Sequence, residues 1–114
     1  MSTESSNRRV VILMYPRVRE LDVAGIVDVF SSANTLLPEE RRYRIEFYST
    51  EPHAEVDGMY GLPMRSGPLF TSLKGKVDTL LVPGGDGIGV GRKKPAVLKW
   101  LRKHTPCSRR VGSV

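Results

Sequence analysis

The sequence predicts an α/β fold in which a largely parallel sheet carries helices on both faces. Two short apolar runs, residues 10–15 and 80–82, each stop at a proline, as expected of strands that are covered on both sides. A segment with helical spacing of apolar residues follows each run, one from Asp22 and one from Pro95. Alternation of strands and helices along a chain is typical of a parallel sheet.

The first unit is predicted as strand, loop, helix and strand. Val10–Tyr15 forms a buried strand that Pro16 ends, and Asp22 is expected to be the N-cap of the helix. Tyr43–Tyr48 alternates between apolar and polar residues, which predicts a strand nearer the sheet edge with one face wet. The helix expected from Asp22 has an apolar stripe formed by Val23, Ile26, Val27, Phe30 and Ala33.

The second half is less regular. Asp57-Gly58 favours a hairpin, and Phe70 and Leu73 are expected to tuck a short turn under the sheet. Pro95 opens a second helix, where its missing N–H does no harm, and Trp100 is expected at the margin of the apolar face of that helix. We expect Thr79–Val82 and Arg110–Val114 to join the first two strands in one sheet.

Composition limits the class of protein. The 114 residues make one domain at most, with residues 1–8 as a flexible tail and 9–114 as the folded part. No apolar run approaches the ~20 residues that cross a membrane. The single cysteine allows no internal disulfide, so we expect a cytoplasmic protein. A net charge of +6 permits acidic partners without requiring them.

The strongest local signal for a site is the glycine pair Gly84-Gly85. It follows the strand Thr79–Val82 at its carboxyl end, where open α/β sheets bind their ligands. Adjacent glycines can bring bare N–H groups close to an anion or a carbonyl. A tight turn without any ligand is an equally good interpretation of this segment by itself.

Three blocks together resemble the ThiJ/PfpI superfamily, whose domains share the class I glutamine-amidotransferase-like, flavodoxin-like fold. They are residues 10–15 with Leu21-Asp22-Val23-Ala24-Gly25 and Val29-Phe30, residues 78–85, and residues 95–101 leading into 109–114. Phe30-Ser31-Ser32-Ala33-Asn34 and residues 96–101 look most like the amidase-like sensor domain of AraC-type transcription regulators. Ile26 departs from the pattern, because the family commonly has proline after Gly25.

The resemblance implies roles for particular residues. Asp22 resembles the acidic residue that faces a reactive cysteine in family enzymes, and Gly84 and Gly85 resemble the backbone donors of the oxyanion hole. These three are therefore the candidate ligand-binding residues. In the family, a strand like Arg110–Val114 runs directly into a nucleophile elbow that bears the cysteine. We therefore expect Val114 not to be the biological end, and the sequence to be the first part of a larger domain.

Other chemistry-bearing residues carry weaker signals. Cys107, with His104 three residues before it, is expected to be a passive thiol, because no helix follows to lower its pKa. His53 is most simply a surface residue, and the sequence predicts no metal site and no cofactor. Glu20 and Asp28 are expected to be surface charges. The glycines of 84–91 fit neither nucleotide-binding motif, and the eight basic residues of 92–110 are expected to form a solvated face.

Two functions from different classes remain open. The first is a ligand-sensing domain of an AraC-type regulator that binds a small molecule, acts as a homodimer and contacts DNA only through a carboxyl-terminal part absent from this sequence. The second is a stand-alone cysteine enzyme of the ThiJ/PfpI type, such as an isonitrile hydratase or a small amidase. No confident catalytic residue lies in the sequence for the second. Asp22 and the glycine pair fit both.

Overall fold

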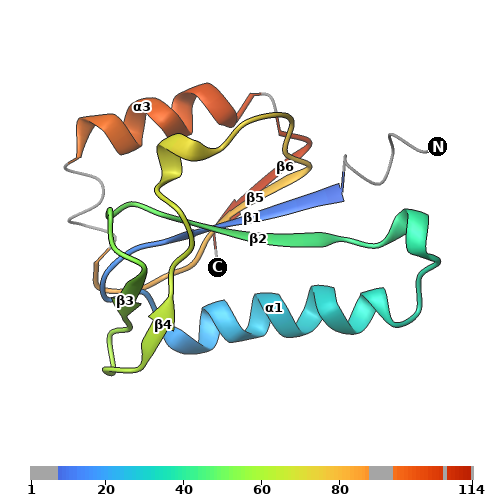
Figure 1. Ribbon diagram of the computed structural model, residues 1–114, viewed down its shortest axis with the longest axis horizontal. Helices are drawn as coiled ribbons and strands as arrows, with labels where there is room; N and C mark the ends of the chain where they lie inside the picture. Colours follow the sequence, from blue (N-terminus) through green and yellow to red (C-terminus); the bar gives the residue numbers. More distant parts are fainter. Residues whose placement is uncertain (1–7, 88–93, 107, 114) are drawn as a thin grey trace.

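The computed structural model describes residues 8–87, 94–106 and 108–113. A four-stranded parallel sheet forms its centre, in the order β2-β1-β5-β6. Figure 1 shows one helix on each side of this sheet, α1 below it and α3 above it. The bounds are β1 Arg9–Met14, α1 Glu20–Asn34, β2 Arg44–Ser49, β5 Thr79–Val82, α3 Pro95–His104 and β6 Arg110–Ser113.

Strand β1 is the centre of the sheet, and all six of its residues are buried. It pairs with β2 over its whole length, from Arg9 opposite Arg44 to Met14 opposite Ser49. On its other side Val10 to Ile12 lie opposite 79–81 of β5. Strand β6 completes the sheet beside β5. The predicted neighbours therefore form one parallel sheet, and the predicted α/β fold class is confirmed.

Alternation along β1 divides the interior into two cores. Val11 and Leu13 point to the α3 side, whereas Ile12 and Met14 point to the α1 side. Phe70, Leu73, Val77, Leu80, Val97 and Trp100 complete the α3-side core, and Tyr15, Val18, Val23, Ile26 and Val56 complete the α1-side core. Each helix thus covers one face, as a parallel sheet requires.

The α3-side core depends on Trp100, which is buried and not at the margin of the helix as predicted. Its ring meets Phe70 edge-on, with 5.7 Å between the ring centroids. Phe70 lies in η3 (Phe70–Ser72), so the predicted turn under the sheet is present. The indole therefore packs between the helix and the turn and contributes a large apolar area to this core.

Strand β2 lies at the sheet edge as predicted, but its second face is not simply wet. There the Arg9 guanidinium donates to both carboxylate oxygens of Glu46, at 3.0 and 2.7 Å. It also donates to the carbonyl oxygens of Lys74 and Lys76, at 2.6 and 3.1 Å. Because Arg9 is only 8% exposed, this cluster ties β2 and the 74–76 loop to the central strand.

The predicted hairpin is formed by β3 (Glu55–Asp57) and β4 (Pro63–Arg65), which pair antiparallel. Its loop is held by Glu20, whose carboxylate accepts the backbone N–H groups of Tyr60 and Leu62 at 2.9 and 3.1 Å. Glu20 is therefore a structural link between α1 and the hairpin, and its prediction as a surface charge was wrong. The remaining short element is η2, Glu39–Arg41.

Candidate functional site

Two loops meet at the carboxyl edge of the sheet, one after β1 (residues 15–19) and one after β5 (residues 83–87). The Arg19 N–H donates to the Gly84 carbonyl at 2.7 Å, and Val18 forms an isolated antiparallel bridge with Gly85. A Cβ on Gly85 would overlap the Arg17 carbonyl oxygen, and one on Gly87 would overlap the Pro16 carbonyl oxygen. Glycine is thus required at both positions because the two backbones lie so close.

Asp22 lies at this meeting point and contacts the glycine pair. Its carboxylate accepts the Gly84 N–H at 3.2 Å, and the Arg19 guanidinium lies 3.9 Å from the same oxygen. The Asp22 side chain is 22% exposed, so the carboxylate is sheltered but still reachable. The structure therefore brings Asp22 and Gly84 together, with Gly85 next along the chain.

Asp22 does not cap the helix, contrary to the prediction. Helix α1 begins at Glu20, its N-cap residue is Arg19, and no side chain caps it. The difference has a physical cause, because the Asp22 carboxylate turns outward to Gly84 and Glu20 is fixed by the hairpin loop. Both carboxylates still lie in the first turn, where they favour the positive end of the helix dipole.

The Tyr15 side chain reaches the backbone just before Gly84 from the interior of the protein. Its hydroxyl donates to the Pro83 carbonyl oxygen, and the residue is 3% exposed. Burial, with a further contribution from the charge of Asp22, raises the pKa of Tyr15 to about 12. The phenol is therefore a hydrogen-bond donor at neutral pH. The sequence interpretation missed this role, because the carbonyl that accepts from the hydroxyl lies 68 residues away in the chain.

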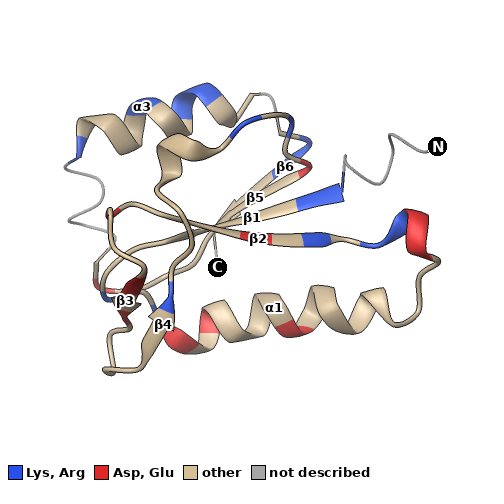
Figure 2. Ribbon diagram, in the orientation of Figure 1, with Lys and Arg blue, Asp and Glu red and all other residues tan. Residues whose placement is uncertain are grey.

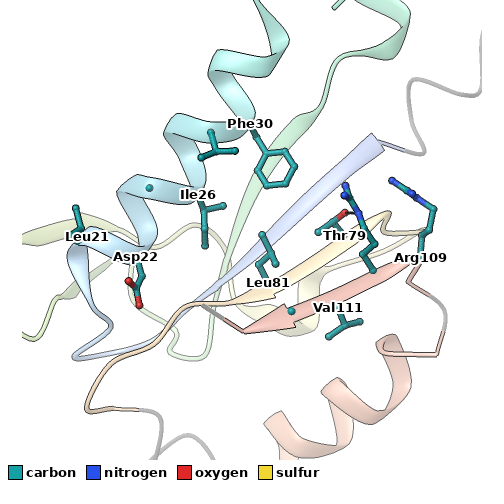
Figure 3. A pocket seen from close by; sticks show the side chains of 12 residues that line it. Leu21, Asp22, Ile26, Phe30, Thr79, Leu81, Arg109 and Val111 are labelled. Carbon is teal, nitrogen blue, oxygen red and sulfur yellow. Dashed lines mark hydrogen bonds between the residues drawn. The ribbon is translucent and has the colours of Figure 1, made fainter.

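A groove of about 780 Å³ opens beside Asp22, between α1 and the β5–β6 part of the sheet. Figure 3 shows Asp22 at one end of the groove, Thr79 and Arg109 at the other, and Leu81 between them. The Val111 side chain points to the α3 side of the sheet, as does Leu80 opposite it in the register. Leu21 and Val29 on α1 are 77% and 66% exposed, and Val111 on β6 is 45% exposed. The groove thus joins a sheltered carboxylate to an open apolar surface.

The arginines at the far end of the groove are held by Asp78. Arg109 donates to its carboxylate at 2.5 and 3.1 Å, and Arg110 lies 3.5 Å away. Although desolvation of Asp78 acts in the opposite direction, its hydrogen bonds to Arg109 and Thr79 lower the pKa of this carboxyl. Two cations against one anion leave this end of the groove positively charged. Figure 2 shows further basic residues along α3 and acidic ones at the start of α1.

The other candidates do not join the site. Asp28 is exposed and Ser32 donates to it at 3.5 Å, so it is a surface charge as predicted. His53 is also exposed, as predicted. His104 stacks on Trp100 at 4.8 Å, and burial, followed by the charge of Lys103, lowers its pKa. Cys107 and the glycines at 89 and 91 lie outside the described residues, as does Val114.

Within residues 8–87, 94–106 and 108–113, no three His, Cys, Asp or Glu side chains gather in a way that could hold a metal ion. No helix in this part of the chain is long and apolar enough to cross a membrane.

The fold of this sheet and its helices is similar to that of solved ThiJ/PfpI and DJ-1 proteins. A ThiJ/PfpI family protein from Pseudomonas syringae superposes with a TM-score of 0.79 at 19% identity, over 94% of this chain and 41% of that one. Drosophila melanogaster DJ-1β gives 0.78 at 14% identity, over 94% and 54%. A candidate transcriptional regulator from Vibrio parahaemolyticus gives 0.74 at 16% identity, over 94% and 56%.

These similarities concern structure. No protein-family profile and no curated protein matches the chain. The chain spans about half the length of the solved structures that it resembles. At identities below 20% the resemblance defines the fold of the described part, which agrees with the family suggested by the sequence.

Proposed function

We propose that the chain is the ligand-sensing, amidase-like part of an AraC-type transcription regulator, which binds a small molecule at the carboxyl edge of the sheet. The observation that supports this most is the contact between Asp22 and the Gly84 N–H at this edge, where the Asp22 side chain is 22% exposed. An N–H or O–H of a ligand can donate to the carboxylate, while neighbouring backbone N–H groups donate to an oxygen of the same ligand. Small amides and related carbonyl compounds have this combination.

The resemblance to the candidate regulator from Vibrio parahaemolyticus favours a sensor within this fold. DNA would be bound by a separate carboxyl-terminal part, because the basic residues on α3 lie on one exposed helix face without an aromatic pattern. A cysteine-dependent hydratase or amidase of the ThiJ/PfpI type is the second candidate. The same Asp22–Gly84 pair supports it, and it would require a nucleophile that the described residues do not supply.

We also propose that the sensor pairs as a homodimer in the cytoplasm, with the groove as the contact surface. Leu21, Gly25 and Val29 recur every four residues and form an exposed ridge on α1 beside the groove. Gly25 has open space where a Cβ would lie, so the described fold itself does not require glycine at this mid-helix position. A close contact with a second helix would give that glycine a purpose.

Charge also favours a second copy as the occupant. The groove ends at Arg109 and Arg110, whereas the last turn of α1 contains no basic residue and Asp28 lies exposed on this helix. One copy thus carries the ridge, with the exposed carboxylate of Asp28 on the same helix, and the groove, with two arginines at one end. Two copies related by a twofold axis could fill each other's groove.

An NMR titration of the ¹⁵N-labelled chain with acetamide and acetate tests the ligand proposal. We expect the amide signals of Gly84 and Gly85 to shift on binding, and the shifts to be lost in Asp22→Ala. Asp28→Ala is the matched control, because it removes an exposed carboxylate from the same helix. Release of ammonia from acetamide would favour the enzyme. Unchanged Gly84 and Gly85 signals with both probes would contradict both functions.

A further inference from the structure

We infer that Tyr15 is a positioning residue of this site: through the Pro83–Gly84 peptide it commits the Gly84 N–H to Asp22, which leaves the Gly85 N–H as the donor to a ligand's oxygen. The geometry of the peptide stands by itself, whereas its meaning for a ligand rests on the proposed function. The two adjacent glycines would therefore have different roles: the Gly84 N–H binds Asp22, and the Gly85 N–H binds the ligand.

The peptide unit between Pro83 and Gly84 is hydrogen-bonded on both sides. The Pro83 carbonyl and the Gly84 N–H belong to the same planar trans peptide, so they point in opposite directions. Tyr15 donates to the oxygen of this unit, and Asp22 accepts from its nitrogen at 3.2 Å. A rotation of the peptide would therefore break two hydrogen bonds at once, one of them in the interior.

The following peptide unit, between Gly84 and Gly85, is held by a hydrogen bond at its carbonyl oxygen. The Gly84 carbonyl accepts the Arg19 N–H at 2.7 Å, so the Gly85 N–H of that peptide points away from Arg19. Among the described residues, the Gly85 N–H has no hydrogen-bond partner. Gly85 has a φ of 151°, and its close contact with the 17–19 backbone admits no side chain. Its donor is thus held in place, and no described residue uses it.

The interior location of the phenol makes the arrangement durable. Tyr15 is 3% exposed and packs in the α1-side core, where water cannot replace it as the donor to Pro83. Because its pKa is raised to about 12, it stays protonated at neutral pH. Phenylalanine has the same ring and lacks only the hydroxyl, so Tyr15→Phe removes the donor while it keeps the packing.

The test is hydrogen exchange of the Gly84 amide by NMR in Tyr15→Phe. We expect this amide to exchange about five- to tenfold faster than in the wild type, as for the loss of one net hydrogen bond, while the β1 amides keep their protection. Tyr43→Phe is the control, because it removes a phenol hydroxyl from another packed ring, which meets Phe30 edge-on with 4.9 Å between the ring centroids. An unchanged Gly84 amide in folded Tyr15→Phe would overturn the inference.

A second measurement needs no substitution. In the wild type we expect the Tyr15 hydroxyl proton to exchange slowly enough to be observed, with a nuclear Overhauser effect to the 83–84 backbone. Its absence would overturn the inference even if Tyr15→Phe did not fold. Titration with acetamide separates the two proposals: if Gly84 responds to Tyr15→Phe but Gly85 never responds to the probe, only the proposed function fails.

Discussion

Arg17 adopts a left-handed backbone conformation with a φ of 67°, which a residue with a Cβ rarely does. The conformation turns the chain from β1 into α1, and it lets the Arg17 N–H donate to Asp57 at 2.9 Å. The side chain pairs with Asp86 at 2.5 Å, but both side chains are more than half exposed. The ion pair therefore compensates little of the backbone strain.

We expect Arg17→Gly to stabilise the protein. Relief of the left-handed strain, about 1–2 kcal/mol, is partly offset by the greater freedom of glycine in the unfolded chain, so the net gain should be about 0.5–1 kcal/mol. Urea unfolding measures it. Arg17→Ala is the control, because it loses the same ion pair and keeps the strain. A glycine variant no more stable than the alanine variant would contradict the role assigned to the backbone.

At the scale of single residues, the sequence was informative where few other contacts were open to a residue. Asp22 and Gly84 were predicted to lie together, and their atoms are 3.2 Å apart. Their use by a ligand stays a prediction. Tyr15 and Glu20 were missed because each acts on the backbone of a segment that is distant in sequence, 68 and about 40 residues away. No local pattern reports such a pairing.

At the scale of elements, the Arg9–Glu46 pair joins the two strands that the α1 crossover connects. Arg9 and Glu46 side chains are 10% and 21% exposed, so the pair is largely removed from water. Although desolvation of Glu46 opposes the effect, the hydrogen bond and charge of Arg9, followed by those of Arg44, lower the pKa of the Glu46 carboxyl. The ionised form is thus favoured in the folded state.

Glu46→Gln should destabilise the protein at pH 7 by about 2 kcal/mol, somewhat less than for a fully buried pair, because Arg9 keeps its two carbonyl acceptors. A lowered folded-state pKa contributes stability that is present above the unfolded value of 4.5 and is lost as pH falls through the folded value. The difference between wild type and variant should therefore shrink in acid.

Urea unfolding at pH 7 and at pH 3 measures this difference. Glu40→Gln, an exposed carboxylate in η2, is the control and should change stability by less than about 0.5 kcal/mol at either pH. A difference for Glu46→Gln that is equal at the two pH values would show that the charge of Glu46 is not what joins the strands.

The elements themselves followed largely from the sequence. Apolar runs indicated β1 and β5, because a strand covered on both faces has apolar residues at successive positions and is easily recognised in the sequence. The N-cap of α1 is Arg19, three residues before the predicted Asp22, since the chain uses Asp22 for a tertiary contact and not as a cap. Periodicity likewise could not distinguish Trp100 in the core from Trp100 at its margin.

At the scale of the whole molecule, the groove between α1 and β6 is the feature without a counterpart in the predictions. It arises because α1 packs on one part of the sheet, and the neighbouring part, with Thr79, Leu81 and Gly112, is left open. A sequence pattern shows that Leu21 and Val29 are apolar but does not show which side of the helix the sheet occupies. The groove depends on tertiary packing, so the structure was needed to find it.

If two copies fill each other's groove, Val29→Lys should abolish association, because it places a charge in an apolar contact. We expect a concentration-dependent dimer for the wild type and a monomer for the variant, measured by light scattering and analytical ultracentrifugation. Leu36→Lys is the control: Leu36 is 87% exposed, lies beyond the end of α1 and does not line the groove. A wild-type chain that stays monomeric at high concentration would contradict the homodimer.

The parallel arrangement of β1, β5 and β6 also determines how the molecule resists mechanical force. Tension between Arg9 and Ser113 pulls β1 toward the amino edge and β6 toward the carboxyl edge, so the strands slide along one another. The β1–β5 and β5–β6 hydrogen bonds then share the load and must yield together. Tension between Arg9 and Arg110, both at the amino edge, peels the strands apart one bond at a time. The same sheet is therefore stiff along one direction of pull and weak along the other.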